Sequence, residues 1–167
     1  MREINRIIVS AIIVSKDNKI LMGKKDPAKG GVYSDCWHLP GGGTEDEQSL
    51  EEALKREMSE EIGIDITPYT AEPLPYIDNG DAEKVLKDTG EKVLCHMEFH
   101  RFKIIIHDKT AGEIKLQLGD DLVETQWFSM SELPGVKQIP GGREFFQKLG
   151  YISKDDETTT EIRHNQK

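Results

Sequence analysis

The sequence predicts a single domain of the α/β class. Several segments rich in Ile and Val are typical of strands, and one segment has the spacing of an amphipathic helix with a capping box. The expected strands cover residues 7–15, 20–22, 93–106 and 122–128, and the expected helix covers residues 49–62. A chain of 167 residues suffices for one substantial core and is too short for two ordinary domains. We expect the domain to span residues 1–151 and a charged, mobile tail to span 152–167.

The first two expected strands should form a hairpin. The segment between them, Lys-Asp-Asn-Lys at residues 16–19, has the composition of a turn. Residues 24–36 are rich in Lys, Gly, Asp and Pro, which indicates a loop. The three glycines at 41–43 follow Trp-His-Leu-Pro and predict a further turn of the backbone.

The expected helix has recognisable ends and one apolar side. Ser49 and Glu52 have the spacing of a capping box, and Gly63 offers the left-handed conformation that ends a helix. Apolar residues recur every four positions and predict a buried stripe, which consists of Leu50, Leu54, Met58 and Ile62.

The remaining segments are less strongly patterned. Residues 64–67 resemble a strand, and the polar segment 69–92 is expected to be an elaborated connection that contains a short helix at 82–87. Two more short helices are expected at 130–133 and 143–149.

The charge of the chain limits its partners. Twenty-two Lys and Arg residues against 31 Asp and Glu give a formal net charge of −9, which opposes binding to duplex nucleic acid. An acidic protein that acts on a polyphosphate must bring cations to its own carboxylates, so such a ligand would imply a metal ion. The sequence leaves open whether the chain forms a homodimer.

The sequence also predicts a cytoplasmic protein with no membrane segment. No apolar run approaches the length of about 18 residues that a membrane-spanning helix requires. The N-terminal residues lack the cleavage pattern of a signal peptide and are expected to lead into the first strand. Cys36 and Cys95 form no metal-ligand spacing and no redox motif, so we expect ordinary thiols in a reducing compartment.

Three glutamates on the expected helix form a candidate metal site. Glu57, Glu60 and Glu61 stand at positions i, i+3 and i+4, at the border of the buried stripe. Like charges at these spacings destabilise a helix, and a bound cation would relieve the repulsion. Clustered carboxylates suit Mg²⁺ or Mn²⁺. The alternative interpretation is a solvated acidic helix face.

The spacing around these glutamates resembles the box motif of the Nudix (MutT-like) hydrolase family. Gly42 is followed, at the family's spacing, by Arg-Glu-Met-Ser-Glu-Glu-Ile-Gly-Ile at residues 56–64. The segment Trp-His-Leu-Pro-Gly-Gly at 37–42 looks like the family's entry to the box. Trp-Phe at 127–128, followed by Glu-Leu-Pro at 132–134, looks like its closing strand. The resemblance covers about residues 7–149.

The resemblance implies a Nudix α/β/α sandwich, with a mixed β-sheet between helices. It assigns the divalent metal ions to four ligands, which are Glu57, Glu60, Glu61 and the carbonyl of Gly41. Arg56 would orient the glutamates. A further acidic residue before the closing strand would act as ligand or base; the candidates are Asp120 and Asp121, and Asp121 is favoured.

The implied activity is metal-dependent hydrolysis of a nucleoside diphosphate linked to another group. Attack of a metal-activated water would break the diphosphate bond. A nucleoside triphosphate, including an oxidised one, is the first expected substrate, and a nucleotide sugar is the second. Lys24 and Lys25 stand where family members often bind phosphate, although both could equally be surface lysines.

One position departs from the family's pattern. Gln48 replaces the first glutamate of the box, which keeps the size of the side chain but removes its charge. We expect retuned activity, and the alternative is a Nudix-fold binding or regulatory module that has lost catalysis. An isomerase acting on an isoprenoid diphosphate is a third option, but Cys36 and Cys95 lack a surrounding pattern that resembles its active site.

Other aromatic and histidine residues receive no catalytic role. Trp37 and Phe99 could stack on a base, but aromatic residues of this kind belong more often to a core. His96, Glu98 and His100 alternate along a strand and share one face. The two histidines are separated by about 13 Å of strand, too far to share a metal ion.

Overall fold

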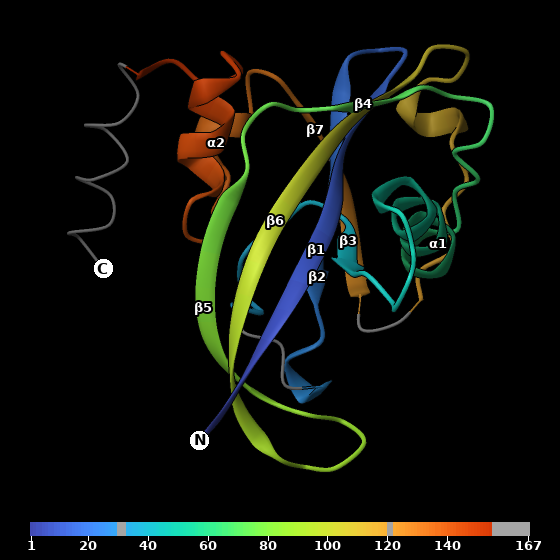
Figure 1. The fold of residues 1–167 in the computed structure, drawn as a ribbon. Coiled ribbons are helices and arrows are strands. Elements are labelled where there is room, and N and C mark those ends of the chain that lie inside the picture. Colours follow the sequence, from blue (N-terminus) through green and yellow to red (C-terminus); the bar gives the residue numbers. More distant parts are fainter. Residues whose placement is uncertain (30–32, 120–121, 155–167) are drawn as a thin grey trace.

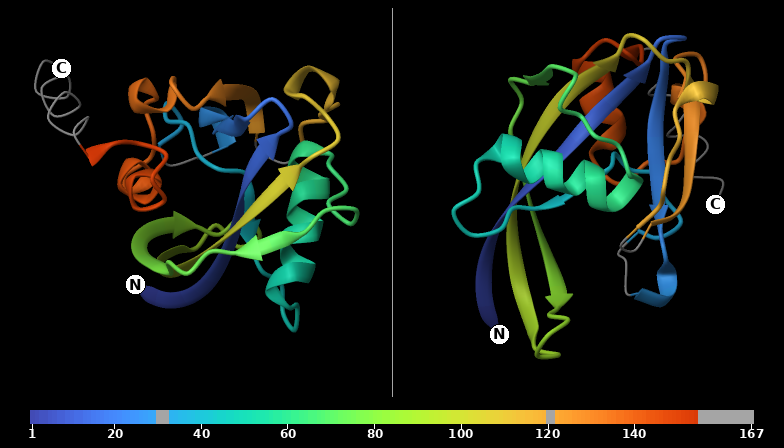
Figure 2. Two further views of the ribbon diagram at one scale, coloured as in Figure 1. Left: turned by 90° about the horizontal axis from the view of Figure 1, so that it is seen from above. Right: turned by 90° about the vertical axis from the view of Figure 1, so that its right-hand side faces the viewer.

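The computed structural model describes residues 1–29, 33–119 and 122–154, and these form a mixed seven-stranded sheet with a helix on each face (Figures 1 and 2). The strands are β1 (Arg2–Ser15), β2 (Lys19–Lys25), β3 (Gly41–Gly43), β4 (Ala71–Pro73), β5 (Asp78–Val85), β6 (Lys92–Ile106) and β7 (Leu122–Ser129). The α-helices are α1 (Leu50–Ile62) and α2 (Gly142–Lys148), and single 3-10 turns lie at Pro27–Lys29, Ala111–Glu113 and Leu133–Gly135. The predicted α/β/α sandwich is confirmed.

The sheet is mixed because β1 and β6 run parallel while the other pairs are antiparallel. Its main path has the order β4-β6-β1-β2-β7, and β3 and β5 pair with β1 and β6 respectively. The hairpin of β1 and β2 is as predicted. Among the described residues, no helix is long and apolar enough to cross a membrane.

Alternate side chains of β1 point into two separate cores, as strand geometry requires. Val9, Ala11 and Ile13 pack toward α1. Ile12 and Val14 pack in the other core, which also contains Phe145 and Phe146 of α2. In the view from above (Figure 2, left), α1 and α2 lie on opposite sides of the long strands.

Part of the sheet extends away from both helices. We call this part the arm; it consists of residues 2–8 of β1, all of β5, and residues 92–99 of β6, and its far end lies at the bottom of Figure 1. At its near end, Asp78 of β5 lies 4.0 Å from Lys148 of α2. The strand β6 lies in the middle of the arm, with β1 on one side and β5 on the other.

Several local predictions were wrong. Residues 82–87 are good helix formers, but residues 82–85 belong to β5, whose pairing with β6 overrides local propensity. Residues 41–43 form the extended strand β3 instead of a turn. Residues 64–67 form no strand, although Ile64 and Ile66 are buried in the core beside α1.

The C-terminal predictions had mixed outcomes. The helix expected at 143–149 is α2, whereas 130–133 is a turn that leads into the 3-10 turn at Leu133–Gly135. Most of the predicted tail, residues 155–167, lies outside the described residues.

Candidate active site

Helix α1 is fixed on the sheet by its apolar stripe and by both of its ends. Leu54, Met58 and Ile62 are fully buried, as predicted, and Leu50 packs against the same core. The Ser49 side chain accepts from the backbone N–H of Glu52, whose carboxylate accepts from the N–H of Ser49 in return (both 3.1 Å). Gly63 ends the helix with φ of 72°. The carboxylates of its last two turns are therefore held in a fixed orientation.

The three glutamates occupy different environments. Glu57 and Glu61 are buried, with 7% and 2% of their surface exposed, whereas the Glu60 side chain is 48% exposed. A fully solvated acidic face would leave all three in water. The burial of two carboxylates on successive turns is costly unless they are bonded or bind a cation.

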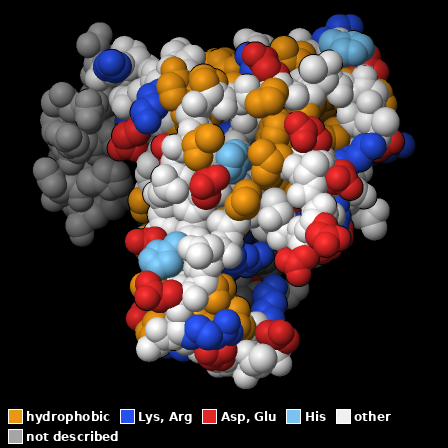
Figure 3. Space-filling view, viewed as in Figure 1, with side chains coloured by type: hydrophobic (Ala, Val, Ile, Leu, Met, Phe, Trp, Pro, Cys, Tyr) orange, Lys and Arg blue, Asp and Glu red, His pale blue; other side chains and the backbone are white. Residues whose placement is uncertain are grey.

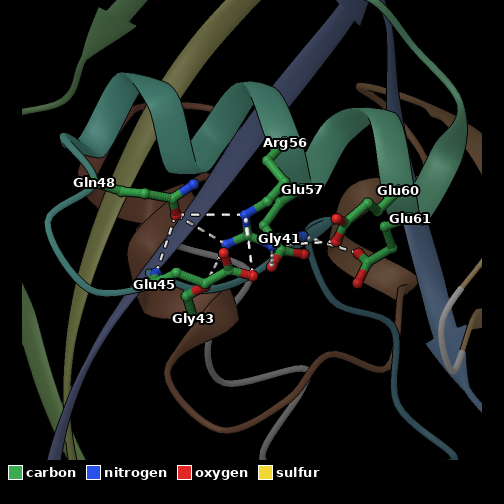
Figure 4. Close-up of polar contacts among 8 residues, drawn as sticks. All are labelled: Gly41, Gly43, Glu45, Gln48, Arg56, Glu57, Glu60 and Glu61. Carbon is green, nitrogen blue, oxygen red and sulfur yellow. Dashed lines mark hydrogen bonds and ion pairs between the residues drawn. The ribbon is translucent and has the colours of Figure 1, made fainter.

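The glycine strand β3 lies directly against these carboxylates (Figure 4). The N–H of Gly41 donates to Oε1 of Glu61 (2.9 Å). A Cβ added to Gly42 would come within 2.5 Å of the carboxylate carbon of Glu57. The glycines therefore allow β3 and α1 to approach each other closely. The sequence alone had instead predicted a turn of the backbone at these glycines.

Arg56 connects the glutamates to the glycine strand. Its Nη1 donates to Oε1 of Glu57 (2.9 Å) and to Oε2 of Glu60 (3.1 Å), and its Nη2 donates to the carbonyl oxygen of Gly43 (2.8 Å). Burial lowers the pKa of Arg56, but the hydrogen bond and charge of Glu57, together with the charges of Glu45 and Glu60, hold the pKa above its ordinary value. Arg56 is thus placed to orient two of the glutamates.

Gln48 contacts Arg56 and not the glutamates of α1. Its Oε1 accepts from Nη2 and Nε of Arg56 (3.2 and 3.4 Å) and from the backbone N–H of Glu45 (3.0 Å). A glutamate here could accept the same hydrogen bonds. The departure from the box therefore keeps the contact and removes only the charge.

Restoring this charge should have a modest effect. We expect Gln48→Glu to change turnover or metal affinity by about tenfold at most, because the added carboxylate acts on the site through Arg56. Metal-dependent kinetics of both proteins would measure it, with Gln126→Glu in β7 as a control of equal charge. An indistinguishable Gln48→Glu would show that this position does not tune the site, and a change much above tenfold would contradict the indirect role.

The predicted basic residues are placed at the end of β2. Lys24 Nζ lies 4.7 Å from the centroid of the Trp37 ring, a cation–π contact. Trp37 itself is buried and packs edge-on against Phe128, with 5.1 Å between centroids, so it belongs to the core beside α2. Lys25 follows a β-bulge in the pairing of β2 with β7.

The histidines of β6 contact acidic residues of β1, β5 and β6. Both ring nitrogens of His96 lie 2.6 Å from carboxylate oxygens, one of Asp81 and one of Glu3. His100 Nε2 lies 2.5 Å from Glu98 Oε1. Both cysteines are buried, and neither is in a disulfide.

The predicted acidic residues Asp120 and Asp121 lie outside the described residues. Gly119, immediately before them, donates its N–H to the backbone carbonyl oxygen of Glu61 (3.0 Å). The N–H of Gln117 donates to the backbone carbonyl oxygen of Ile62 (3.0 Å). The chain therefore runs along the C-terminal end of α1 just before residue 120.

The oxygen donors of α1 and β3 fit a hard divalent ion in their chemistry. Carboxylates and backbone carbonyls are the ligands that Mg²⁺ prefers, and Gly42 leaves room for the buried Glu57. In the described part of the chain, no three acidic, His or Cys side chains converge enough to hold an ion as they stand. The carboxylate of Glu60 accepts a hydrogen bond from Arg56.

Comparison with known proteins identifies the family. The family model described as NUDIX domain matches residues 4–149. The chain belongs to the Nudix family. Relatives of this Nudix protein include the "ADP-ribose pyrophosphatase" of Methanocaldococcus jannaschii, 33% identical over 122 residues that cover 73% of this chain and 61% of the relative. The "Nucleoside triphosphatase NudI" of Escherichia coli is 38% identical over 126 residues, which cover 72% of this chain and 80% of the relative.

A solved structure shows the same fold. The E. coli dihydroneopterin triphosphate pyrophosphohydrolase superposes with a TM-score of 0.64 over 85% of this chain and 92% of its own, at 15% identity. The residues aligned with the Methanocaldococcus jannaschii relative span 61% of its length, which is less than two thirds.

Proposed function

We propose that this Nudix protein hydrolyses the diphosphate bond of a nucleoside diphosphate linked to another group, with Mg²⁺ or Mn²⁺. The observation that carries the proposal is the pair of buried carboxylates, Glu57 and Glu61, held against the glycine strand. Their burial is explained if they hold cations that bind phosphate.

Each residue of the site has a proposed part. Glu57, Glu60, Glu61 and the Gly41 carbonyl would hold the ions, and Arg56 orients Glu57 and Glu60. When bound, the ions would lower the pKa of a water and neutralise charge on the phosphate oxygens.

Two further parts come from the flanking segments. Asp121 is proposed as an additional ligand or base, which is supported by the path of Gly119 beside Glu61. Lys24 and Lys25 would bind phosphate at the end of β2. The domain is proposed to span residues 1–151, acting in the cytoplasm on a small nucleotide and not on duplex nucleic acid.

A nucleoside triphosphate, oxidised or not, is the preferred substrate, and a nucleotide sugar or similar conjugate is the second. The printed names of the two relatives support both classes, one a nucleoside triphosphatase and one an ADP-ribose pyrophosphatase. A panel of substrates tests the proposal and ranks the two classes. It contains nucleoside triphosphates, oxidised triphosphates, nucleotide sugars and ADP-ribose. The assay measures Mg²⁺-dependent release of phosphate, pyrophosphate or nucleoside monophosphate. Metal binding without turnover of any panel compound would favour the binding-module alternative.

Divalent metal should also stabilise the folded protein. The fold concentrates Glu57, Glu60 and Glu61, whereas the unfolded chain does not, so binding should stabilise by about 2.7 kcal/mol at a hundredfold excess over Kd. Thermal unfolding with Mg²⁺ or Mn²⁺, against the same buffer with chelator, would show a raised Tm. The shift should shrink in Glu61→Gln and persist in Glu51→Gln, an exposed acid of the same helix. No shift at millimolar metal, with no binding heat, would contradict the metal site.

A further inference from the structure

Two cations of the arm share one face of its sheet. Arg6 of β1 lies opposite Met97 of β6, and Lys84 of β5 lies opposite Val93. Val93 and Met97 are four residues apart on one strand, so Arg6 and Lys84 stand on the same face. Val93 and Cys95 belong to the same face of β6 and are wholly buried, so the surface between the two cations is apolar. The long side chains of Arg6 and Lys84 can reach toward one another across this surface.

Arg6 also touches the glycine strand of the candidate active site. A Cβ added to Gly43 would overlap the guanidinium of Arg6, so the two are in direct contact. The carbonyl of the same glycine accepts from Arg56. The arm thus brings a positive charge to the edge of the site, one residue away from the glycine that makes room for Glu57.

Neither cation is paired with a carboxylate among the described residues. Within the described ranges, the side chains of Arg6 and Lys84 have no hydrogen bond or ion pair, although the chain carries a formal net charge of −9. Both are half-buried. Burial, and then the charges of Arg6 and Lys25, hold the pKa of Lys84 below its ordinary value. In Figure 3, Lys and Arg side chains are visible in the hollow between the arm and the rest of the molecule.

We propose that Arg6 and Lys84 form an anion subsite that binds a phosphate group of the substrate beside the glycine strand. An anion would relieve the repulsion among half-buried cations, and the planar fork of Arg6 suits phosphate oxygens. The subsite rests on the proposed function, because it assigns the polyphosphate end of that substrate to the arm. Because Lys84 belongs to β5, this strand then contributes to substrate selection. Substrates that carry one more phosphate group should bind more tightly than otherwise similar substrates without it.

Pyrophosphate binding to the metal-free protein tests the subsite without requiring turnover. Titration calorimetry in chelator should show binding to the wild type that weakens about tenfold or more in Arg6→Gln and in Lys84→Gln. Arg6→Lys keeps the charge and should recover part of the affinity. Lys109→Gln, which removes an equal charge from an exposed turn at the opposite end of β6, should bind as the wild type does. Equal binding by all variants, or no binding by the wild type, would overturn the subsite.

Kinetics separate this proposal from the proposed function. On the best substrate of the panel, Arg6→Gln and Lys84→Gln should raise KM about tenfold and change kcat little, because the subsite binds ground state and transition state alike. If no compound is hydrolysed but pyrophosphate binding depends on Arg6 and Lys84, the subsite stands and the hydrolase proposal fails. If hydrolysis occurs with unchanged KM in both variants, the subsite fails alone.

Discussion

Glu61→Gln should lower turnover by about a hundredfold or more, equivalent to about 2.7 kcal/mol of transition-state stabilisation, while the fold stays intact. Glutamine keeps the shape of the buried side chain and can still accept from the N–H of Gly41, so the packing of α1 on β3 is preserved. What it loses is the charge proposed to hold a catalytic ion. Glu60→Gln should show a comparable loss, although the Glu60 side chain is half-exposed.

The measurement is kcat at saturating substrate and metal, with circular dichroism to verify the fold. Glu51→Gln on the first turn of α1 is the matched control, since it removes the same charge from an exposed position of the same helix. Wild-type turnover in both Glu60→Gln and Glu61→Gln would remove the basis for the metal assignment.

Gly42→Ala should be almost as damaging, although it adds a single methyl group. The new Cβ would lie 2.5 Å from the carboxylate carbon of Glu57, and the backbone of β3 cannot retreat easily because it is paired with β1. We expect Glu57 to be displaced, turnover to fall by about a hundredfold, and the free energy of unfolding to fall by about 1–3 kcal/mol.

Kinetics and thermal unfolding would check this result together. Gly112→Ala is the control, because a Cβ there meets nothing within 4 Å. If Gly42→Ala kept wild-type turnover and metal affinity, the close contact between strand and helix would have no part in the site.

The sequence predicted the elements that have a strong local signal. Helix α1 has both a periodic apolar stripe and two terminal signals, and its bounds agree with the prediction within a residue. The long strands β1 and β6 are dominated by β-branched and other apolar residues, so their existence was evident. Their parallel pairing could not be predicted from either segment alone.

The errors occurred where tertiary contacts override local preference. The segment at 82–87 looks helical in isolation, and only pairing with β6 makes its first part a strand. The glycines of β3 have negative φ and are needed for the space they leave. Spacing alone could not reveal that their neighbours would be Glu57 and Arg6.

The candidate site could be predicted as a set of residues but not as a set of contacts. The box motif singled out Arg56, Glu57, Glu60 and Glu61. The sequence could not show that Arg56 would contact two of these glutamates, nor that Gln48 would accept from Arg56. Arg6 and Lys84 lie 78 positions apart in the sequence and carry no local signal, so only the pairing of β1, β6 and β5 brings them together.

The most direct test of the central claim is the dependence of hydrolysis on divalent metal for the wild-type protein. Initial rates on the panel's best substrate, measured as Mg²⁺ or Mn²⁺ is titrated into chelated protein, should rise from background to saturation. The same titration with Glu61→Gln should stay near background. Full activity in chelator, or no hydrolysis of any panel compound at any metal concentration, would contradict the account.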